Sequence, residues 1–425
     1  MQFVCEPSLL NGTISIPGSK SHTIRAVAIA ALADGQSVID KPLISADTVS
    51  ALHAVTALGA QTSADTDSWR VTGTGGRPTL RKDTIDVGNS GTTLRLLLGT
   101  TALLPHNQTV TLTGDTQIQR RPNAPLIAAL NDLGATVVSV HDNGCAPIRV
   151  TGTMHGGQTS LEATSSQFVS SLLIACPMAE RDTTFTVSKL CERAYIQITM
   201  DWLDTQQIVY DHDTMRRFQI PGKQAYKPFH RRIPGDFSSA TFFFGAGAIP
   251  GNDVTCTGLD LSDSQPDKAV IDYVRSMGAN VDVQVDSIRI SGTSLHGVDI
   301  DMNETPDALP VMAVLGCFAN GETTLRNVAQ ARIKETDRIH VMATELRKMG
   351  ARVEELQDGL VIHESPLRGT AVNGHADHRV VMALALAATQ ATGTTTISTA
   401  EAAGVTFPEF ATLMTSIGAH ILSRD

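Results

Sequence analysis

The clearest pattern along the chain is a junction at which a short polar segment changes abruptly into an almost entirely apolar one. The first junction, at Ser19, reads SKSHTIRAVAIAALA, and five later segments repeat the change. The six junctions are about 70 residues apart and begin near Ser19, Gly88, Ser165, Gly235, Thr305 and Ala376. A helix that is apolar on all sides is typically buried, so the pattern predicts six buried helices with polar N-termini. It also predicts a chain assembled from repeated units.

A second pattern follows most of the buried segments. A turn rich in glycine, asparagine or aspartate leads into a short strand-like run such as HNQTVTLTG. An amphipathic segment then ends at Gly-Ala, as in ALNDLGA up to Ala135, where glycine suits a helix C-terminus that needs positive φ. Two further strand-like runs usually close the unit, although the third copy, around DWLDTQQIVY, lacks the Gly-Ala stop.

The last copy is incomplete, because the sequence ends at GAHILSRD without a closing strand-like run. Residues 11–18, NGTISIPG, resemble the missing run and end in the same Ile-Pro-Gly as Ile220–Gly222. We therefore expect the N-terminal segment to complete the C-terminal half. A chain of 425 residues with three units per half predicts two α/β domains, 1–19 with 235–425 and 20–234, in which sheets cover buried helices.

Composition narrows the possible partners. A net charge of −10 argues against nucleic acid or an anionic membrane as the main partner, so cations for an anionic ligand must be concentrated locally. The six cysteines form no C-x-x-C pair and the histidines show no H-E-x-x-H spacing, so we expect no metal. The start MQFVCEPSLLNG does not resemble a signal peptide, and no apolar stretch reaches the ~20 residues of a membrane span. We expect a soluble, cytoplasmic protein.

Cationic residues gather at several of the junctions. Lys20 and Arg25 lie at the first, Arg95 lies one turn into the second, and Arg379 lies at the sixth, while Arg121 precedes a proline-started helix. If the N-termini of the buried helices converge on one cleft, their dipoles and these cations form a binding site for phosphates and carboxylates. The alternative is that each junction is simply a capped helix.

The segment ARIKETDRIHVMATELRKMG is predicted to open a helix that contains Lys334, Glu335 and Arg338. Lys334 and Arg338 would share one face and repel each other unless an anion lies between them, although an ordinary surface charge ladder is the alternative. Asp307 and Glu335 are candidate acid–base groups. Each also suits the N-terminal cap of a helix, which is the role predicted for Asp236.

The segments PGSKSHTIR, GNSGTTLR, RRP, TSSQF, PDALPVM, RIKETDRI and ADHRVVMA together resemble the motifs of the 5-enolpyruvylshikimate-3-phosphate synthases. The resemblance covers the whole chain in order. It implies transfer of the enolpyruvyl group of phosphoenolpyruvate to the 5-hydroxyl of shikimate 3-phosphate, a step towards chorismate and the aromatic amino acids, with no cofactor. It also implies a monomer with an inside-out α/β barrel fold, in which sheets cover parallel helices.

The resemblance further implies which positions act. Catalytic roles fall to Asp307 as the base for the 5-hydroxyl, Glu335 as the proton donor to the methylene carbon, and Lys20. The positions implied to contact shikimate 3-phosphate or both substrates are Lys20, Ser21, Arg25, Ser165, Ser166, Gln167, Asp307, Gln330 and Lys334. The positions implied to approach phosphoenolpyruvate are Asn89, Gly91, Thr92, Arg121, Arg338 and Arg379.

Several positions depart from the family's pattern. Glu192, in ERAYI, stands where the family has a phosphate-binding serine, and a carboxylate beside a phosphate is unfavourable. Either Glu192 points away or the loop register differs, and Ser188 and Lys189 are possible substitutes. Gln330 replaces an asparagine, and Glu401 stands where some bacterial members carry a lysine. Gly91 keeps the residue that the family associates with sensitivity to glyphosate.

Two alternatives remain at this point. A UDP-N-acetylglucosamine enolpyruvyl transferase would share the fold, but it uses a reactive cysteine before the Arg-Arg-Pro segment, where GDTQIQRRP has none. A non-catalytic protein that binds phosphorylated metabolites would need the arginines but neither Asp307 nor Glu335.

Overall fold

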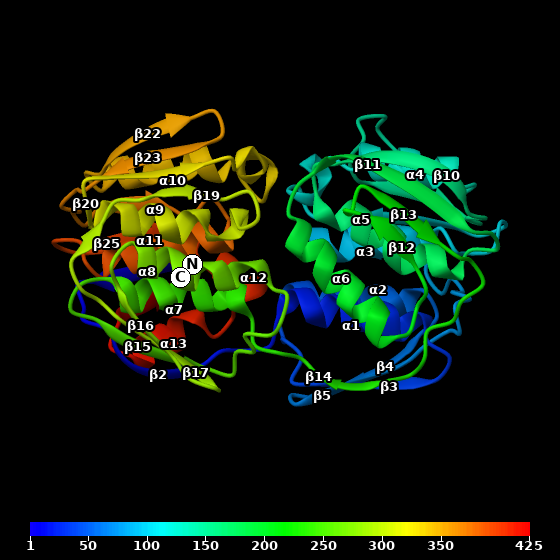
Figure 1. Cartoon of the computed structure of the whole chain (residues 1–425), viewed down its shortest axis with the longest axis horizontal. Helices are drawn as coiled ribbons and strands as arrows, with labels where there is room; N and C mark the ends of the chain where they lie inside the picture. The colour runs from blue at the N-terminus through cyan, green and yellow to red at the C-terminus, as the bar shows by residue number, and fades with distance from the viewer. The chain divides into compact units, whose positions relative to one another are not determined.

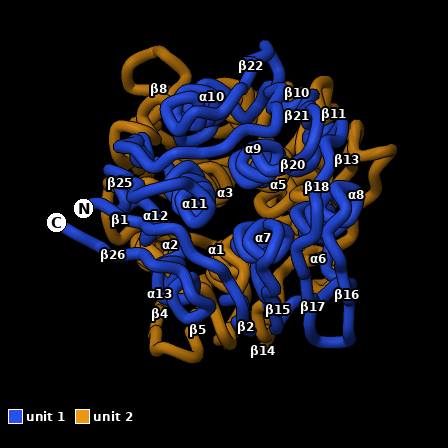
Figure 2. The backbone as a smooth tube through the Cα atoms, turned by 90° about the vertical axis from the view of Figure 1, so that its left-hand side faces the viewer, with its two compact units in different colours: residues 1–17, 234–425 blue, residues 18–233 orange.

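In the computed structural model, which describes residues 1–425, the chain forms two units that it crosses between twice (Figure 2). Unit 1 comprises Met1–Pro17 and Pro234–Asp425, and unit 2 comprises Gly18–Ile233. The domain boundaries predicted from the sequence lie one or two residues beyond these crossings.

Unit 2 has three helices that are buried along almost their whole length and three that are more exposed. Figure 1 labels these helices at the right of the view. The buried helices are α1 (Lys20–Leu32), α3 (Gly91–Thr101) and α5 (Ser166–Ala175). The other helices are α2 (Ala46–Ala57), α4 (Ala124–Asp132) and α6 (Arg193–Thr205).

Three separate four-stranded sheets cover the helices of unit 2. The first contains, in order, β14 (His230–Arg232), β3 (Gln36–Asp40), β5 (Ser68–Thr72) and β4 (Gln61–Ala64). The second contains β6 (Thr84–Asp86), β7 (Thr109–Thr113), β9 (Ile148–Thr151) and β8 (Thr136–Ser139). The third contains β10 (Gly157–Ala163), β11 (Thr183–Leu190), β13 (Arg217–Ile220) and β12 (Asp211–Asp213).

Unit 1 repeats this plan. Its buried helices are α7 (Phe237–Ala248), α9 (Leu309–Cys317) and α11 (His378–Ala388). The remaining helices are α8 (Val270–Ser276), α10 (Arg338–Lys348), α12 (Ala403–Thr406) and α13 (Phe410–Ser416).

The sheets of unit 1 have the same strand arrangement as those of unit 2. The first contains β2 (Asn11–Ser15), β15 (Asp253–Thr257), β17 (Ser287–Ser291) and β16 (Asn280–Val283). The second contains β19 (Asp299–Asp301), β21 (Glu322–Arg326), β23 (Gly359–His363) and β22 (Arg352–Leu356). The third contains β24 (Ala371–Asn373), β25 (Thr395–Ser398), β1 (Gln2–Glu6) and β26 (His420–Arg424), and a small pair joins β18 (Leu295–His296) to β20 (Ala319–Asn320).

All six four-stranded sheets share one pairing pattern. The first two strands run parallel and the other neighbours run antiparallel, as in β6, β7, β9 and β8. In four of the six, a buried helix connects the parallel pair, which is the βαβ connection predicted for each repeat. The predicted α/β class is therefore correct. The sheets remain separate, however, so the predicted barrel of strands does not close.

The two exceptions arise where the chain crosses between units. Strand β2 pairs in parallel with β15 of unit 1, and β14 pairs in parallel with β3 of unit 2. The closing strand missing from the last repeat is supplied by β1, which lies between β25 and β26. The prediction that residues 11–18 supply that strand is wrong. Residues 2–6 do so because Phe3 and Cys5, which alternate with less buried neighbours, point into the core.

The buried helices begin at polar residues that satisfy their first amide groups. Ser19, Ser90 and Ser165 accept amide hydrogen bonds at the starts of α1, α3 and α5, and Asp377 does so at α11. Asp236, the predicted cap of α7, instead accepts a hydrogen bond from Ser239 Oγ at 2.7 Å, because Gln265 Oε1 already satisfies the Phe237 amide.

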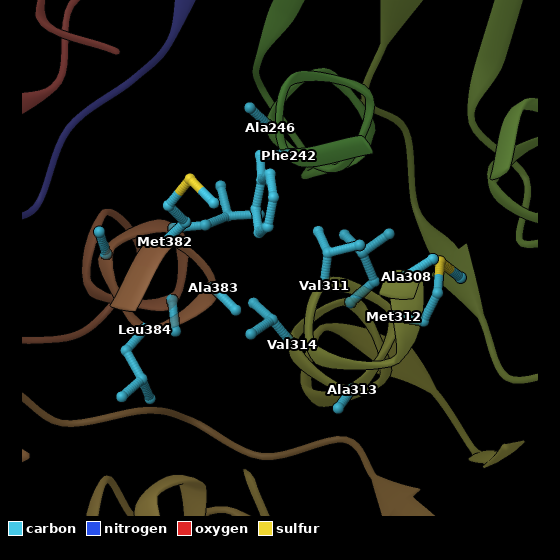
Figure 3. Close-up of a cluster of buried hydrophobic side chains, with 14 of the residues drawn as sticks. Phe242, Ala246, Ala308, Val311, Met312, Ala313, Val314, Met382, Ala383 and Leu384 are labelled. Atoms are coloured by element: carbon cyan, nitrogen blue, oxygen red, sulfur yellow. The ribbon is translucent and has the colours of Figure 1, made fainter. Parts of the chain in front are cut away.

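Close packing of α7, α9 and α11 forms the core of unit 1 (Figure 3). Phe242 and Met382 point toward each other, as do Val314 and Ala383. Gly245 permits this approach, since a Cβ atom there would lie 2.6 Å from Val311 Cγ2. Gly99 has the same role in unit 2, where an added Cβ would lie 2.7 Å from the carbonyl oxygen of Ser171. No helix has both the length and the hydropathy needed to cross a bilayer.

Replacing Gly245 by alanine should therefore destabilise the protein despite the better helix propensity of alanine. Overpacking of this kind costs about 1–3 kcal/mol, measurable as a lower midpoint of urea-induced unfolding. Gly404→Ala is the matched control, because Gly404 lies in α12 with nothing within 4 Å of an added Cβ. It should be neutral or stabilise by up to about 1 kcal/mol. Equal effects of the two substitutions would contradict close packing at Gly245.

Candidate functional site

In unit 1, the carboxylate of Asp307 lies among three cations at the start of α9. Asp307 belongs to a single 3₁₀ turn, Pro306–Ala308, directly before that helix. Its Oδ1 is 2.7 Å from Nη1 of Arg338 and 3.9 Å from Nζ of Lys334. Its Oδ2 is 3.1 Å from Nη2 of Arg379. The anion expected between Lys334 and Arg338 is thus a side chain of the protein itself.

Arg338 is the buried centre of this cluster. Its side chain is 1% exposed and reaches three carboxylates, those of Asp307, Glu335 and Asp377. Its Nε donates to Asp377 Oδ2 at 2.8 Å, and its Nη2 donates to Glu335. Each edge of the guanidinium therefore has an ionic partner, which a buried charge requires.

The helix predicted to open before Lys334 begins only at Arg338, so that prediction is wrong. Asp337 caps α10 by accepting a hydrogen bond from the His340 amide at 3.0 Å, and Lys334 follows a 3₁₀ turn, Ala329–Ile333. Lys334 and Arg338 therefore meet through Asp307 and not through a shared helix face.

The charges in this cluster shift its pKa values strongly. Burial opposes ionisation of Asp307, but the charges of Arg379, Lys334 and Arg338 outweigh it and hold its pKa far below the usual value. Burial likewise opposes the charge of Arg338, and Asp377, Glu335 and Asp307 overcome it and raise its pKa. Both groups are therefore fully ionised near neutral pH, and Asp307 is a poor base while these contacts last.

Arg379 is held from two sides. Its Nη2 donates to Ser238 Oγ at 2.7 Å, and Ser238 in turn donates to Asp267 Oδ2 at 2.6 Å. The carboxylate of Asp377 also accepts from the backbone amide of Arg379 at 2.9 Å. Sequence reasoning did not assign Asp377, Ser238 or Asp267 to the site, although Asp377 lies in the ADHR segment that supplies Arg379.

Gln330 lies near this cluster along the chain but is bonded elsewhere. Its Nε2 donates to the carbonyl oxygen of Asn303 at 2.8 Å. Glu401 pairs with the N-terminal amino group of Met1 at 3.1 Å and is 60% exposed, so it takes no part in the carboxylate cluster around Arg338.

In unit 2, the start of α1 carries a second ion pair. Lys20 Nζ is 3.1 Å from Oδ2 of Asp47, whose side chain is 6% exposed. Arg25, one turn later, is buried, and its guanidinium donates to Thr199 Oγ1 at 2.8 Å and to the Tyr195 carbonyl at 3.0 Å. Burial lowers the pKa of Arg25 to about 10. Ser21 accepts from Arg25 through its backbone carbonyl.

The starts of α3 and α5 are joined by a polar network. Arg95 Nη1 donates to Gln167 Oε1 at 3.0 Å and to Ser165 Oγ at 3.4 Å. Gln167 Nε2 donates to Thr92 Oγ1 at 2.9 Å. The structure thus brings together Thr92, Ser165 and Gln167. Arg95, noted as a cation in the sequence but not assigned a substrate contact, connects them.

Arg121 lies against the first turn of α3. A Cβ atom at Gly91 would be 2.5 Å from Nη1 of Arg121, so glycine leaves room for that guanidinium. Asn89, two residues earlier, donates through Nδ2 to Asp115 at 2.6 Å and to Gln117 at 3.0 Å. Gly91 and Arg121 therefore lie together as the predicted assignment requires.

Glu192 directly precedes α6 in the chain, and its side chain reaches the start of α5. In the family, this position holds a phosphate-binding serine. Its side chain is buried, and its Oε2 accepts a hydrogen bond from Ser166 Oγ at 2.9 Å. The amide of Ser166 is 3.5 Å from the same oxygen. The carboxylate therefore points toward the helix N-terminus and not away from it.

Comparisons with known proteins agree with this chemistry. The sequence matches the family described as EPSP synthase (3-phosphoshikimate 1-carboxyvinyltransferase) over residues 4–414. It is 50% identical to the 3-phosphoshikimate 1-carboxyvinyltransferase of Acetivibrio thermocellus, with 97% of each chain covered. It is 43% identical to that of Methanocella arvoryzae, with 96% of this chain and 97% of the relative covered.

Solved structures give the same result. An EPSP synthase from Acinetobacter baumannii superposes with a TM-score of 0.83 at 26% identity, covering 99% of this chain and all of the other. A second structure of EPSP synthase from that organism gives the same TM-score at 25% identity and covers 100% of both chains. Since the family match and the relatives both extend over nearly the whole sequence, the chain belongs to the family of the EPSP synthases, the 3-phosphoshikimate 1-carboxyvinyltransferases.

Proposed function

We propose that the chain transfers the enolpyruvyl group of phosphoenolpyruvate to the 5-hydroxyl of shikimate 3-phosphate with release of phosphate, and that the two polar clusters provide the groups for this reaction. The observation that carries the proposal is the Asp307 carboxylate held by Lys334, Arg338 and Arg379. These three cations and one carboxylate are the groups that addition and elimination at an anionic enol phosphate need.

Asp307 acts as the general base. Without substrate, its charge is neutralised by the three cations, and its pKa is too low for efficient proton transfer. The phosphate and carboxylate of phosphoenolpyruvate compete with Asp307 for Arg338 and Arg379, since arginine pairs well with both groups. As those contacts weaken, the pKa of Asp307 rises toward its ordinary range. The base thus becomes effective when the second substrate is bound.

Glu335 acts as the acid that protonates the methylene carbon. The hydroxyl oxygen adds to the central carbon of the enol while the proton from Glu335 goes to the methylene carbon, and Asp307 takes the hydroxyl proton. Phosphate then leaves the tetrahedral intermediate and takes up the proton held by Asp307. A methyl proton returns to Glu335, which regenerates the carbon–carbon double bond and restores both carboxylates. Lys20, Arg121, Arg338 and Arg379 stabilise the leaving phosphate, so the reaction needs no cofactor.

The remaining predicted residues bind and orient the substrates. Ser165, Ser166 and Gln167 contact shikimate 3-phosphate, together with Ser21, Arg25, Gln330 and Lys334. Asn89, Gly91 and Thr92 approach phosphoenolpyruvate beside Arg121. The guanidinium of Arg25 also bonds to Thr199 Oγ1 and to the Tyr195 carbonyl, which fixes its position beside α6.

The proposal extends to the domain arrangement, the oligomeric state and the location of the protein. Units 1 and 2 are two domains of three repeats each, in the inside-out α/β arrangement, and the chain acts as a cytoplasmic monomer. The deciding experiment measures phosphate release by the purified protein from phosphoenolpyruvate with shikimate 3-phosphate. UDP-N-acetylglucosamine should not replace the acceptor. The proposal would be overturned if phosphate were released with UDP-N-acetylglucosamine but not with shikimate 3-phosphate, or if neither acceptor supported its release.

Replacing Glu335 by glutamine should lower kcat for this reaction by about 10²–10⁴, because it removes the acid while leaving a side chain of the same shape. Arg338 keeps Asp307 and Asp377 as partners, so the fold should survive. Glu354→Gln, an exposed change on β22, is the matched control and should leave kcat unchanged. Steady-state kinetics with both substrates distinguish the cases, and an unimpaired Glu335→Gln enzyme would exclude the assigned role.

Arg379→Gln should raise the KM for phosphoenolpyruvate by about ten- to a hundred-fold, because one charged hydrogen-bonding partner of the anion is lost. Arg347→Gln is the control, since Arg347 is exposed on α10 and donates to the Val353 carbonyl at 2.9 Å. The KM of the Arg347→Gln enzyme for phosphoenolpyruvate should stay within about two-fold of the parent value, because surface substitutions usually have small effects. Increasing salt should raise the KM of the parent enzyme as well. If both arginine variants behaved alike, Arg379 would not hold the substrate.

A further inference from the structure

The carboxylate of Glu192 lies at the start of α5, which the proposed function assigns to shikimate 3-phosphate. Because Glu192 stands where the family has a phosphate-binding serine, we place the phosphate of the acceptor there. Two groups of Ser166, the hydroxyl at 2.9 Å and the amide at 3.5 Å, face its Oε2. Ser165 and Gln167 flank this position, and α5 is buried along almost its whole length. The inference below rests on that assignment.

A buried helix N-terminus needs an anionic or hydrogen-bonding partner for its free amides. Glu192 meets this need, since its side chain is only 3% exposed and its charge lies at the positive end of the helix dipole. A phosphate monoester that uses the same hydroxyl and amide would bring two negative charges into contact in a buried place. Like charges so placed repel each other strongly, so the two anions exclude each other.

The backbone on both sides of Glu192 is hydrogen-bonded, whereas its side chain can adopt other rotamers. The Cys191 amide donates to the Ala163 carbonyl at 3.3 Å, and the Tyr195 amide donates to the Glu192 carbonyl at 3.1 Å. Glu192 also directly precedes α6, whose residues Tyr195 and Thr199 hold Arg25. Rotation about the side-chain bonds of Glu192 can withdraw the carboxylate without disturbing these contacts.

We propose that Glu192 sets the affinity of the acceptor site. Its carboxylate takes the place of the acceptor's phosphate in the substrate-free enzyme, and it must leave Ser166 before the phosphate monoester binds. In the enzyme without substrate, Glu192 thereby provides a hydrogen-bonding partner for Ser166 at the start of α5. The enzyme consequently binds its phosphorylated substrate more weakly than it would if that helix N-terminus were free. Glu192 contacts no reacting atom, so it acts on binding and not on the chemical step.

Glu192→Gln tests this proposal, because it removes the charge and keeps the hydrogen bond from Ser166. The KM for shikimate 3-phosphate should fall about ten-fold, whereas the KM for phosphoenolpyruvate should change less than about two-fold. Glu162→Gln removes the same charge from an exposed position on β10 of the same unit and serves as the control. It should leave both values unchanged.

A second measurement does not depend on turnover. Inorganic phosphate should raise the Tm of the Glu192→Gln protein more than that of the parent, compared at equal ionic strength with chloride. An unchanged or higher KM for shikimate 3-phosphate, together with an equal Tm shift, would overturn the role of Glu192. If the parent protein released no phosphate from the two substrates, the proposed function would fail, and the Tm comparison would still decide whether Glu192 competes with phosphate.

Discussion

The structure of unit 1 depends on one requirement, that the buried charge of Arg338 be paired on every side. Its guanidinium is almost inaccessible to water and lies against the carboxylates of Asp307, Glu335 and Asp377. At an effective dielectric constant near 20, one such contact at ~4 Å contributes about 4 kcal/mol before desolvation. An arginine left unpaired there would not be tolerated, so the three elements that carry these carboxylates must meet at one point. Those elements are the turn before α9, the turn before α10 and the start of α11. The first two belong to the fifth repeat and the third begins the sixth.

The repeat explains how such distant residues come together. Each repeat places a buried helix behind a short polar turn, and each four-stranded sheet uses the same order of parallel and antiparallel pairs. Small residues such as Gly245 and Gly99 let neighbouring helices approach closely. The packing of the interior then holds the helix N-termini and the candidate residues on them, such as Arg379. Lys334 and Glu335 lie in the turn before α10 instead.

Much of this was predictable from the sequence, because the signals concerned are local. The change from polar to apolar residues identified the buried helices, and the cations near their starts drew attention to Lys20 and Arg379. Arg121, Lys334 and Arg338 were noted in polar segments before two other helices. Pairing across long distances was not predictable in the same way. Residues 11–18 resemble a closing strand, yet the five residues of β1 take that place, because strand pairing depends on which buried faces fit together. The start of α10 was also misplaced, because the predicted helix contained Lys334 and Glu335, whereas α10 begins at Arg338 after the cap residue Asp337. Asp377 and Asp47 were not assigned to the site, because the sequence does not show which cation a carboxylate will pair with in the folded chain.

The proposed binding residues of both units already hold anions that belong to the chain. Asp307 faces Arg338 and Arg379, Asp47 faces Lys20, and Glu192 faces Ser166. A net charge of −10 is compatible with anionic substrates for this reason, because the local cations are neutralised in pairs rather than exposed. In the proposed function, substrate binding exchanges one anion for another, and its free energy is a difference between two strong interactions and not their sum. The same proposal couples binding to chemistry, because Asp307, once released from its cations, regains the proton affinity that its proposed role as a base needs. On this proposal the substrate that displaces the carboxylate also activates it, and catalysis is conditional on a filled site.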